Sequence, residues 1–471
     1  MKIFITILAI FAIGAGLLYL NACKKPETKA TAATELPDSL KTPMPDWAKN
    51  AVIYEVNWRQ FTPEGTIAAF EKHLVRLKHL GVDVLWFMPV NPISEEKRKE
   101  GLGSYYAVAD YRGVNPELGT MEEFKNMVQK IHELGMKIII DWVPNHTGWD
   151  HPWIKEHPEF YTQDAAGNII DPVDPATGKS WGWTDVADLN YDNKEMRKAM
   201  LGDMCFWLTD VGIDGFRMDV AHNVPNDFWD EARETLFTLK PDIFMLAEAE
   251  VPYFRNSGDF AADYGWSLHH LLNDIAKGKK PASALDEWLK TDREKNRRGF
   301  HMQFITNHDE NSWNGTEYER MGEGVDAFAV LSFTFDGMPL IYTGQESAFN
   351  RRFKFFTKDS TDWGDYSKAD FYRTLVDLKH KNKALWNGEY GGVVQKIATG
   401  HDDKIYAFVR EKEGDKVLVV LNLSPDNVEF TLDSDLVVGE YNNVFAASTQ
   451  SMTKGIALSM KPWEYLVLSN R

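Results

Sequence analysis

Cysteine and paired histidines are the scarcest features of this sequence. Only Cys23 and Cys205 occur among its 471 residues, so a disulfide framework and a thiolate zinc site are both excluded. The histidine patterns H-x-H and H-E-x-x-H are also missing. Their absence argues against a metal-dependent hydrolase barrel, because such an enzyme needs histidines at ligand spacing.

Positive charge is in short supply as well. The chain has 52 Lys and Arg against 70 Asp and Glu, which gives a formal net charge of -18. Such a surface repels phosphate backbones, so no nucleic-acid partner is expected, whereas a neutral substrate needs no steering charge. The content of 44% hydrophobic and 26% charged residues is that of a globular protein and excludes a disordered or collagen-like chain.

A long apolar run occurs at the N-terminus, within residues 1–22. It ends in Leu20-Asn21-Ala22-Cys23 and resembles a bacterial lipoprotein signal peptide, which predicts lipidation of Cys23 and export of the rest of the chain. The alternative is an uncleaved membrane anchor, because the run is near the length that spans a bilayer. Residues 23–48 are polar and rich in Pro and Thr, which predicts a flexible tether. Both interpretations predict an exported protein held at a bacterial membrane; whether this is the outer membrane, and on which side the body lies, stays open.

Short apolar runs alternate with amphipathic stretches from Ala51 onward. This alternation predicts a parallel sheet with helices on both faces, and residues 65–80 show a helical repeat that Gly81 ends. Eight candidate strands predict an α/β fold, a (β/α)8 TIM barrel over residues 49–385. The strands are expected at 51–56, 82–89, 136–140, 213–218, 243–247, 261–266 (a weak pattern), 303–306 and 339–342.

The spacing of acidic residues indicates where the barrel is interrupted. Asp219 and Glu248 are 29 residues apart, about one βα unit, whereas Asp141 and Asp219 are 78 residues apart. Residues 147–188, rich in Trp, Pro, Gly and Asp, therefore predict a short insertion after the third strand, on the catalytic rim. Residues 386–471 alternate without long helices, with strands expected at 404–409, 416–421, 427–432 and 465–468, and predict a C-terminal antiparallel β-sandwich domain.

Polar residues cluster where the candidate barrel strands end. The motifs at these points are DWVPNH (141–146), GFRMDVAHN (215–223), AEAE (247–250) and FITNHDEN (304–311). Catalytic groups of such barrels lie at the C-terminal ends of the strands, so these side chains are expected at one mouth. Several carboxylates in one cavity repel each other, which is unfavourable unless they serve chemistry or a metal.

These four motifs, in this order and spacing, resemble the signature regions of the α-amylase family, glycoside hydrolase family 13. Further matches are YYAVADY (105–111), ADLN (187–190) and GMPLIYTGQE (337–346). The resemblance covers about residues 50–385, and the family's usual C-terminal domain agrees with the predicted β-sandwich.

The resemblance implies a retaining glycosidase that cleaves α-glucosidic, mainly α-1,4, bonds of starch-like glucans or maltooligosaccharides through a covalent glycosyl-enzyme. Asp219 would be the nucleophile, Glu248 the general acid/base and Asp309 a third carboxylate that stabilises the distorted sugar. Arg217, on the same strand face as Asp219, would keep that carboxylate ionised and oriented. The further substrate-binding residues implied are Asp141, His146, His222, His308 and Tyr106, the last stacking beneath the sugar.

No cofactor is expected for the chemistry, but the family often holds a structural calcium. Its usual ligands are an Asn, an acid from the insertion and a His, and this chain offers Asn145 and Asp188 with Asn223 in place of the His. Because Asn can supply a carbonyl oxygen to calcium, the site stays open.

Other functions also stay open. The same intermediate serves an α-glucan transglycosylase, an α-glucosidase or a cyclomaltodextrinase/neopullulanase-type enzyme. The alternative from another class is a non-catalytic glycan-binding lipoprotein, against which the intact Arg217, Asp219, Glu248 and Asp309 argue.

Overall fold

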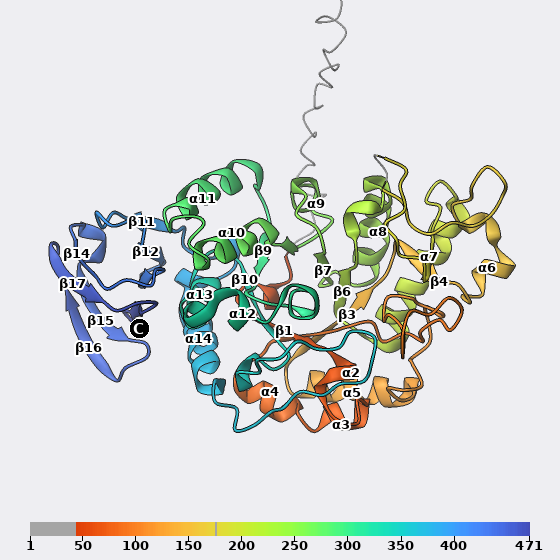
Figure 1. The fold of residues 1–471 in the computed structure, drawn as a ribbon, viewed down its shortest axis with the longest axis horizontal. Helices are drawn as coiled ribbons and strands as arrows, with labels where there is room; N and C mark the ends of the chain where they lie inside the picture. The colour runs from red at the N-terminus through yellow and green to blue at the C-terminus, as the bar shows by residue number, and fades with distance from the viewer. Residues whose placement is uncertain (1–43, 175–176) are drawn as a thin grey trace, which may run out of the picture. The chain divides into compact units, whose positions relative to one another are not determined.

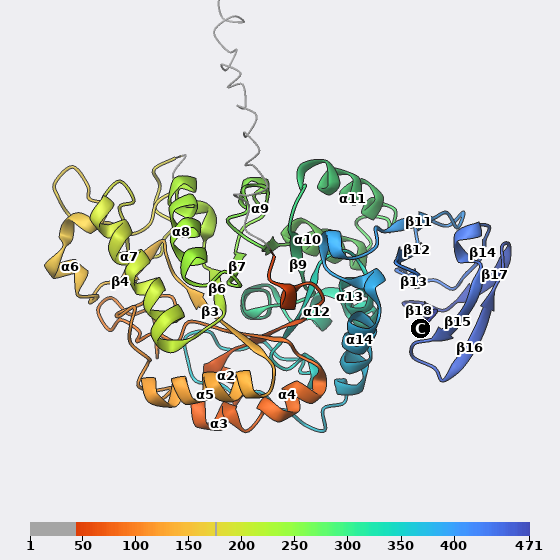
Figure 2. The same cartoon turned by 180° about the vertical axis from the view of Figure 1, so that it is seen from behind.

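Eight parallel strands close a barrel in the computed structural model, which describes residues 44–174 and 177–471 (Figures 1 and 2). Their order around the barrel is β1-β10-β9-β8-β7-β6-β3-β2. The predicted (β/α)8 fold is thereby confirmed, and the weak sixth strand is present as β8. The bounds are β1 (Ile53–Val56), β2 (Val84–Phe87), β3 (Lys137–Trp142), β6 (Gly215–Met218), β7 (Phe244–Ala247), β8 (Ala262–Tyr264), β9 (Phe300–Gln303) and β10 (Met338–Tyr342).

Side chains of the barrel strands alternate between two cores. In β2, Val84 and Trp86 belong to the cluster inside the barrel, whereas Leu85 and Phe87 pack in the larger cluster between strands and helices. This is the period-two pattern that a closed sheet requires.

Helices surround the barrel on its outer side (Figure 1). The expected helix at 65–80 is divided into α3 and α4 at Lys72 and His73, and Gly81, with a φ of 94°, ends α4 as predicted. The helices are α2 (Trp58–Phe61), α3 (Ile67–Glu71), α4 (Leu74–Leu80), α5 (Met121–Glu133), α7 (Lys194–Phe206), α8 (Asn226–Leu239), α9 (Pro252–Ser257), α10 (Trp266–Ala276), α11 (Ala284–Lys295), α12 (Glu317–Met321), α13 (Val325–Thr334) and α14 (Ala369–Lys381).

One strand prediction is misplaced. The seventh strand was expected at 303–306, but β9 is Phe300–Gln303. His301 and Gln303 are both buried in this strand, so its polar residues hide it from a search for apolar runs.

The rim insertion is short and contains little regular structure. Its elements are β4 (His146–Gly148), α6 (Trp153–Glu156) and β5 (Val186–Asp188), and β4 pairs with β5 antiparallel. This pairing places His146 opposite Asp188.

The C-terminal part forms two antiparallel sheets with a shared apolar core, as predicted for a β-sandwich. The larger sheet contains β11 (Gln395–Ile397), β12 (Ile405–Lys412), β13 (Asp415–Asn422), β15 (Gly439–Asn443), β16 (Ser448–Met452) and β18 (Tyr465–Ser469). The smaller sheet contains β14 (Val428–Leu432) and β17 (Ile456–Met460).

The predicted leader, Cys23 and most of the tether lie outside the described residues. Across 44–174 and 177–471, no helix is both long and apolar enough to cross a bilayer.

Candidate active site

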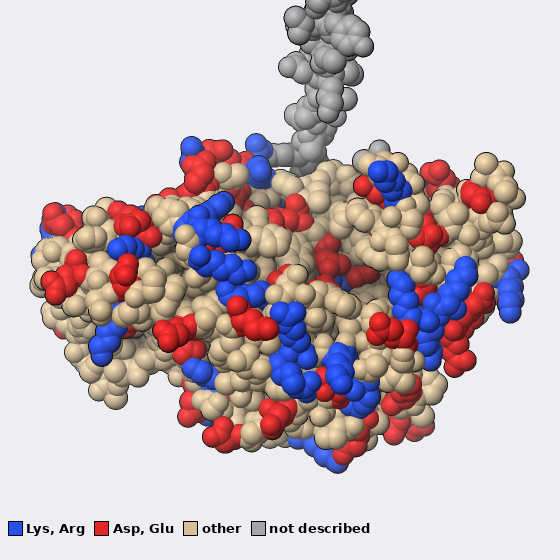
Figure 3. All heavy atoms as spheres, viewed as in Figure 1, with Lys and Arg blue, Asp and Glu red and all other residues tan. Residues whose placement is uncertain are grey.

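The carboxylates gather because neighbouring parallel strands end together. Asp141 of β3 and Arg217 of β6 are register partners. The ladder continues beyond them, since the Asp219 amide donates to the Trp142 carbonyl at 2.8 Å and the Glu248 amide to the Met218 carbonyl at 3.0 Å. The acids predicted at one mouth are therefore at one mouth, and Figure 3 shows acidic side chains within a hollow of this face.

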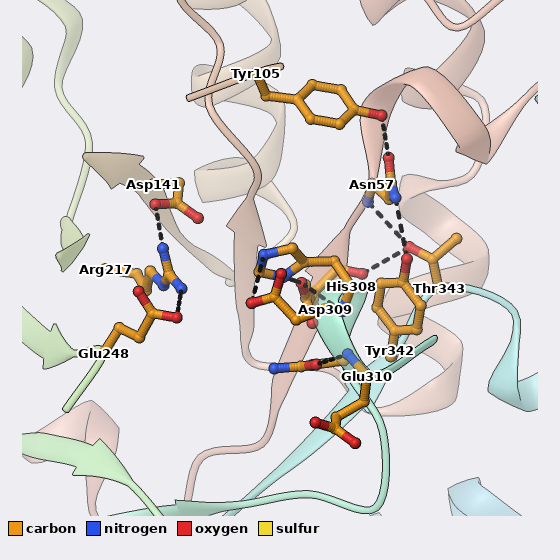
Figure 4. A network of polar contacts seen from close by, with 12 residues as sticks. Asn57, Tyr105, Asp141, Arg217, Glu248, His308, Asp309, Glu310, Tyr342 and Thr343 are labelled. Carbon is orange, nitrogen blue, oxygen red and sulfur yellow. Dashed lines mark hydrogen bonds and ion pairs between the residues drawn. The ribbon is translucent and has the colours of Figure 1, made fainter. Parts of the chain in front are cut away.

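Arg217 joins three carboxylates through one buried guanidinium. Figure 4 shows its contacts with Asp141 and Glu248. Its Nη1 lies 2.8 Å from Asp141 Oδ1 and 2.9 Å from Asp219 Oδ1. Its Nη2 lies 2.9 Å from Glu248 Oε1. Its Nε donates to the Tyr264 hydroxyl at 3.0 Å. One positive charge thus serves three acids on three adjacent strands.

This sharing determines the protonation of the site. Burial raises the pKa of Asp141 to about 7, although Arg217 lowers it. Burial and the Glu248 carboxylate raise the pKa of Asp219 well above its ordinary value, again against the pull of Arg217. The predicted contact between Arg217 and Asp219 is present, and Arg217 lowers the pKa of Asp219 in opposition to burial. Because Asp141 and Asp219 contact the same guanidinium, we expect each to influence the titration of the other.

Val220, the residue after Asp219, has a strained backbone. Its φ of 45° and ψ of 42° lie in the left-handed region, which a β-branched residue rarely adopts. This conformation turns its amide toward Glu248, and the amide donates to Oε2 at 2.8 Å. Glu248 is consequently held by Arg217 through one oxygen and by Val220 through the other.

A second polar network surrounds His308. Its Nδ1 lies 2.6 Å from Glu55 Oε1, and its Nε2 lies 2.8 Å from the Tyr106 hydroxyl and 3.3 Å from Asp309 Oδ2. Burial lowers the pKa of His308, but Asp309 and Glu55 outweigh it and raise that pKa to about 9. His308 is accordingly an imidazolium at neutral pH.

Sequence reasoning missed Glu55. It is fully buried at the end of β1, and burial raises its pKa against the effect of His308. A carboxylate inside the apolar run Ile53-Tyr54-Glu55-Val56 was the available signal, because a buried acid needs a cationic partner.

A cavity of about 300 Å³, here called the catalytic cavity, lies over these groups. Asp219, Glu248 and Asp309 line it, together with three of the predicted sugar-binding residues, Tyr106, His146 and His308. Burial lowers the pKa of His146 to about 4, so this histidine is neutral. Asp141 and Arg217 are not among the lining residues and lie buried beneath. Lining residues that the sequence did not single out include Lys99, Phe355 and Phe356.

The remaining predicted residue, His222, lines an adjoining cavity. This tryptophan cavity, of about 340 Å³, is lined by Trp181, Trp183, Trp266, His222 and Glu250 among others. Glu248, Val220 and Trp183 line both cavities, so the two are contiguous. The rings of Trp181 and Trp183 are stacked with centroids 5.9 Å apart, and 44% of Trp181 is exposed.

The calcium candidates lie beside the cavity. Asn145 directly precedes His146, and His146 is the register partner of Asp188 in the β4–β5 pairing. Burial raises the pKa of Asp188 to about 6. Among the described residues, no group of three or more His, Cys, Asp or Glu side chains is placed to hold a metal ion. Calcium at Asn145 and Asp188 therefore stays a prediction, and no step below depends on it.

Residues 36–393 match the family model described as alpha amylase, catalytic domain, which covers well over half of the chain. The chain belongs to the alpha-amylase family. A second match of this alpha-amylase family protein, at residues 405–467, is to the alpha-amylase SusG C-terminal domain.

Individual relatives of this alpha-amylase family protein are themselves named alpha-amylases. It is 28% identical over 427 residues to Alpha-amylase MalA of Haloarcula japonica, covering 87% of this chain and 61% of that protein. It is 26% identical over 456 residues to Alpha-amylase 3 of Dictyoglomus thermophilum, covering 83% of this chain and 88% of that protein. A solved structure, the noncanonic maltogenic alpha-amylase AmyB from Thermotoga neapolitana, superimposes with a TM-score of 0.79 at 28% identity, over 90% of this chain and 99% of that one.

Proposed function

We propose that this protein is a retaining glycosidase that cleaves α-glucosidic, mainly α-1,4, bonds of starch-like glucans or maltooligosaccharides. The observation that carries the proposal is the pair Asp219 and Glu248, which contact one guanidinium from adjacent strands and line the same cavity. Two close carboxylates are what double displacement at a sugar carbon requires. The names of the relatives support an α-glucan as substrate.

The reaction follows from this geometry in two steps. Asp219 attacks the anomeric carbon while the bond from that carbon to the glycosidic oxygen breaks, and Glu248 gives its proton to the departing oxygen. Glu248 then takes a proton from water, whose oxygen attacks the same carbon and displaces Asp219. Two inversions return the α configuration. The Val220 amide and Arg217 aim Glu248 for both proton transfers.

The other residues of the catalytic cavity would hold the sugar at the reacting position. Asp309 is paired with the His308 imidazolium. Burial raises the pKa of Asp309, and His308 opposes this by lowering it, so the imidazolium favours the carboxylate form that would stabilise positive charge on the ring. Tyr106 stacks near His308, with ring centroids 5.8 Å apart, and offers an apolar face beside them.

The stereochemistry and size of the first products test this function. Maltoheptaose followed by proton NMR should give products that appear first as the α anomer and only later equilibrate. A β anomer at early times would overturn the retaining mechanism. Products longer than the substrate would instead identify the transglycosylase alternative, and failure to cleave any α-glucan would leave the glycan-binding one.

Replacing Glu55 with glutamine should move the pH profile. The change keeps the shape but removes the anion 2.6 Å from His308 Nδ1, so the pKa of His308 falls from about 9 toward its ordinary 6.5. His308 then loses its proton at lower pH, and the alkaline limb of kcat/KM should shift down by about one pH unit or more.

The control for this change is His301, a histidine that does not line the catalytic cavity. His301 also has a pKa raised to about 9, by Asp263 at 2.7 Å, although burial lowers it. Asp263→Asn should leave the alkaline limb of activity where it is. If Glu55→Gln reduces activity equally at every pH, Glu55 serves packing alone.

Lipid anchoring through Cys23 is a further proposal and is supported by the sequence alone. Membrane fractionation of cells that express the wild type or Cys23→Ala tests it, because loss of the lipid should release the exported protein from the membrane.

A further inference from the structure

Glu248 identifies the side of the cleft on which the departing sugar lies. A general acid protonates the oxygen of the departing segment, so that segment is next to Glu248. The tryptophan cavity is lined by Glu248 but by neither Asp219 nor Asp309. It is therefore on the departing side, and the glycosyl unit that Asp219 attacks lies in the catalytic cavity.

A third cavity, of about 550 Å³, adjoins the tryptophan cavity. Glu250 lines both cavities and forms part of their common wall. Its carboxylate accepts hydrogen bonds from the Ser267 amide and hydroxyl, and Ser267 Oγ also accepts from the indole N–H of Trp288 at 2.7 Å. We call this third cavity, between α9, α10 and α11, the Trp288 groove.

The lining of the Trp288 groove suits a neutral polyhydroxylated ligand. Trp288, Leu271 and Pro252 supply apolar surface, and Trp288 is held by Phe335 with ring centroids 5.9 Å apart while it lines the groove. The charged lining residues are Glu250, Glu287 and Asp292 against Lys280 and Lys295. With both signs interspersed, the groove attracts neither anions nor cations strongly, but it offers donors and acceptors around an aromatic platform.

We propose that the Trp288 groove binds the departing end of a long α-glucan, as an extension of the tryptophan cavity. The path runs from Glu248 past the Trp181–Trp183 pair and Trp266 to Glu250 and Trp288. Short substrates end before the groove, whereas long chains continue into it. The proposal rests on the proposed function, because it needs cleavage of an α-glucan in the catalytic cavity.

Replacing Trp288 with alanine tests this path through chain-length dependence. We expect KM for a long amylose fraction to rise about five-fold, as for the loss of one aromatic contact, while kcat/KM for maltotriose stays unchanged. Trp288→Phe keeps a ring and should retain most of the affinity for the long chain. Thermal unfolding of each variant shows whether the fold is intact.

A second variant keeps the test decisive if Trp288→Ala does not fold. Lys295 is exposed on the rim of the groove, so Lys295→Trp should be tolerated and should obstruct the groove, raising KM for the long chain but not for maltotriose. Unchanged KM for the long chain in a folded variant overturns the inference. Loss of binding to insoluble starch with unchanged KM for the soluble long chain also overturns it, since the groove would then be separate from the cleft. A wild type that cleaves no α-glucan refutes the proposed function instead.

Discussion

Asp219→Asn should lower kcat on soluble starch by a factor on the order of 10⁴ or more, the largest effect of any substitution proposed here. Asparagine preserves the shape of the side chain but cannot form the covalent glycosyl-enzyme. An asparagine NH2 group placed against the Arg217 guanidinium would find no acceptor there, because the guanidinium only donates hydrogen bonds. Release of reducing sugar by purified wild type and variant, at equal folded fraction, measures the loss.

Asp210→Asn is the matched control, because it removes the same charge from a residue that is exposed in the segment Trp207–Val211. It should retain wild-type activity. Mass spectrometry after reaction with a slow glycosyl fluoride should place the covalent label on the peptide with Asp219. Substantial activity of Asp219→Asn, or a label on another carboxylate, contradicts the assignment.

Glu248→Gln should reduce turnover of α-glucans by about 10³-fold, since both proton transfers are lost. The variant differs from Asp219→Asn in what it can still do. A glycosyl fluoride needs no proton on its leaving group, so the glycosyl-enzyme should still form and accumulate. Azide needs no general base, so it should restore turnover and give a glycosyl azide.

Glu234→Gln, on the exposed side of α8, is the control for this change and should behave as wild type. If azide restores nothing and the fluoride is not consumed, Glu248 is not the acid/base.

The barrel was predictable because its information is periodic and local. The apolar run of β3 leads into Asp141, and β6 ends directly before Asp219; the parallel topology alone brings such ends together. β9 was misplaced because its buried polar side chains, His301 and Gln303, are compensated by partners outside the strand. His301 meets Asp263 and Asp292, and Gln303 donates to the Asp336 carbonyl.

The site was predictable only as far as its motifs reach. Motifs carried Asp219, Glu248, Asp309 and the neighbouring histidines, and the structure brings them to one mouth. Glu55 stands alone in an apolar strand, and its role is visible only when His308, 253 residues away, lies against it. The sequence alone could not distinguish Trp288 from a core tryptophan, because the same side chain packs against the core and lines the groove.

Val220 marks a place where heat resistance and turnover oppose each other. A valine held in the left-handed region stores roughly 1–3 kcal/mol of backbone strain, a sizeable fraction of the stability of an ordinary protein. Selection for thermal tolerance alone should therefore favour substitutions at Val220. Variants that relax its backbone should gain stability but turn the amide away from Glu248, so stability gained at this position should come with slower turnover.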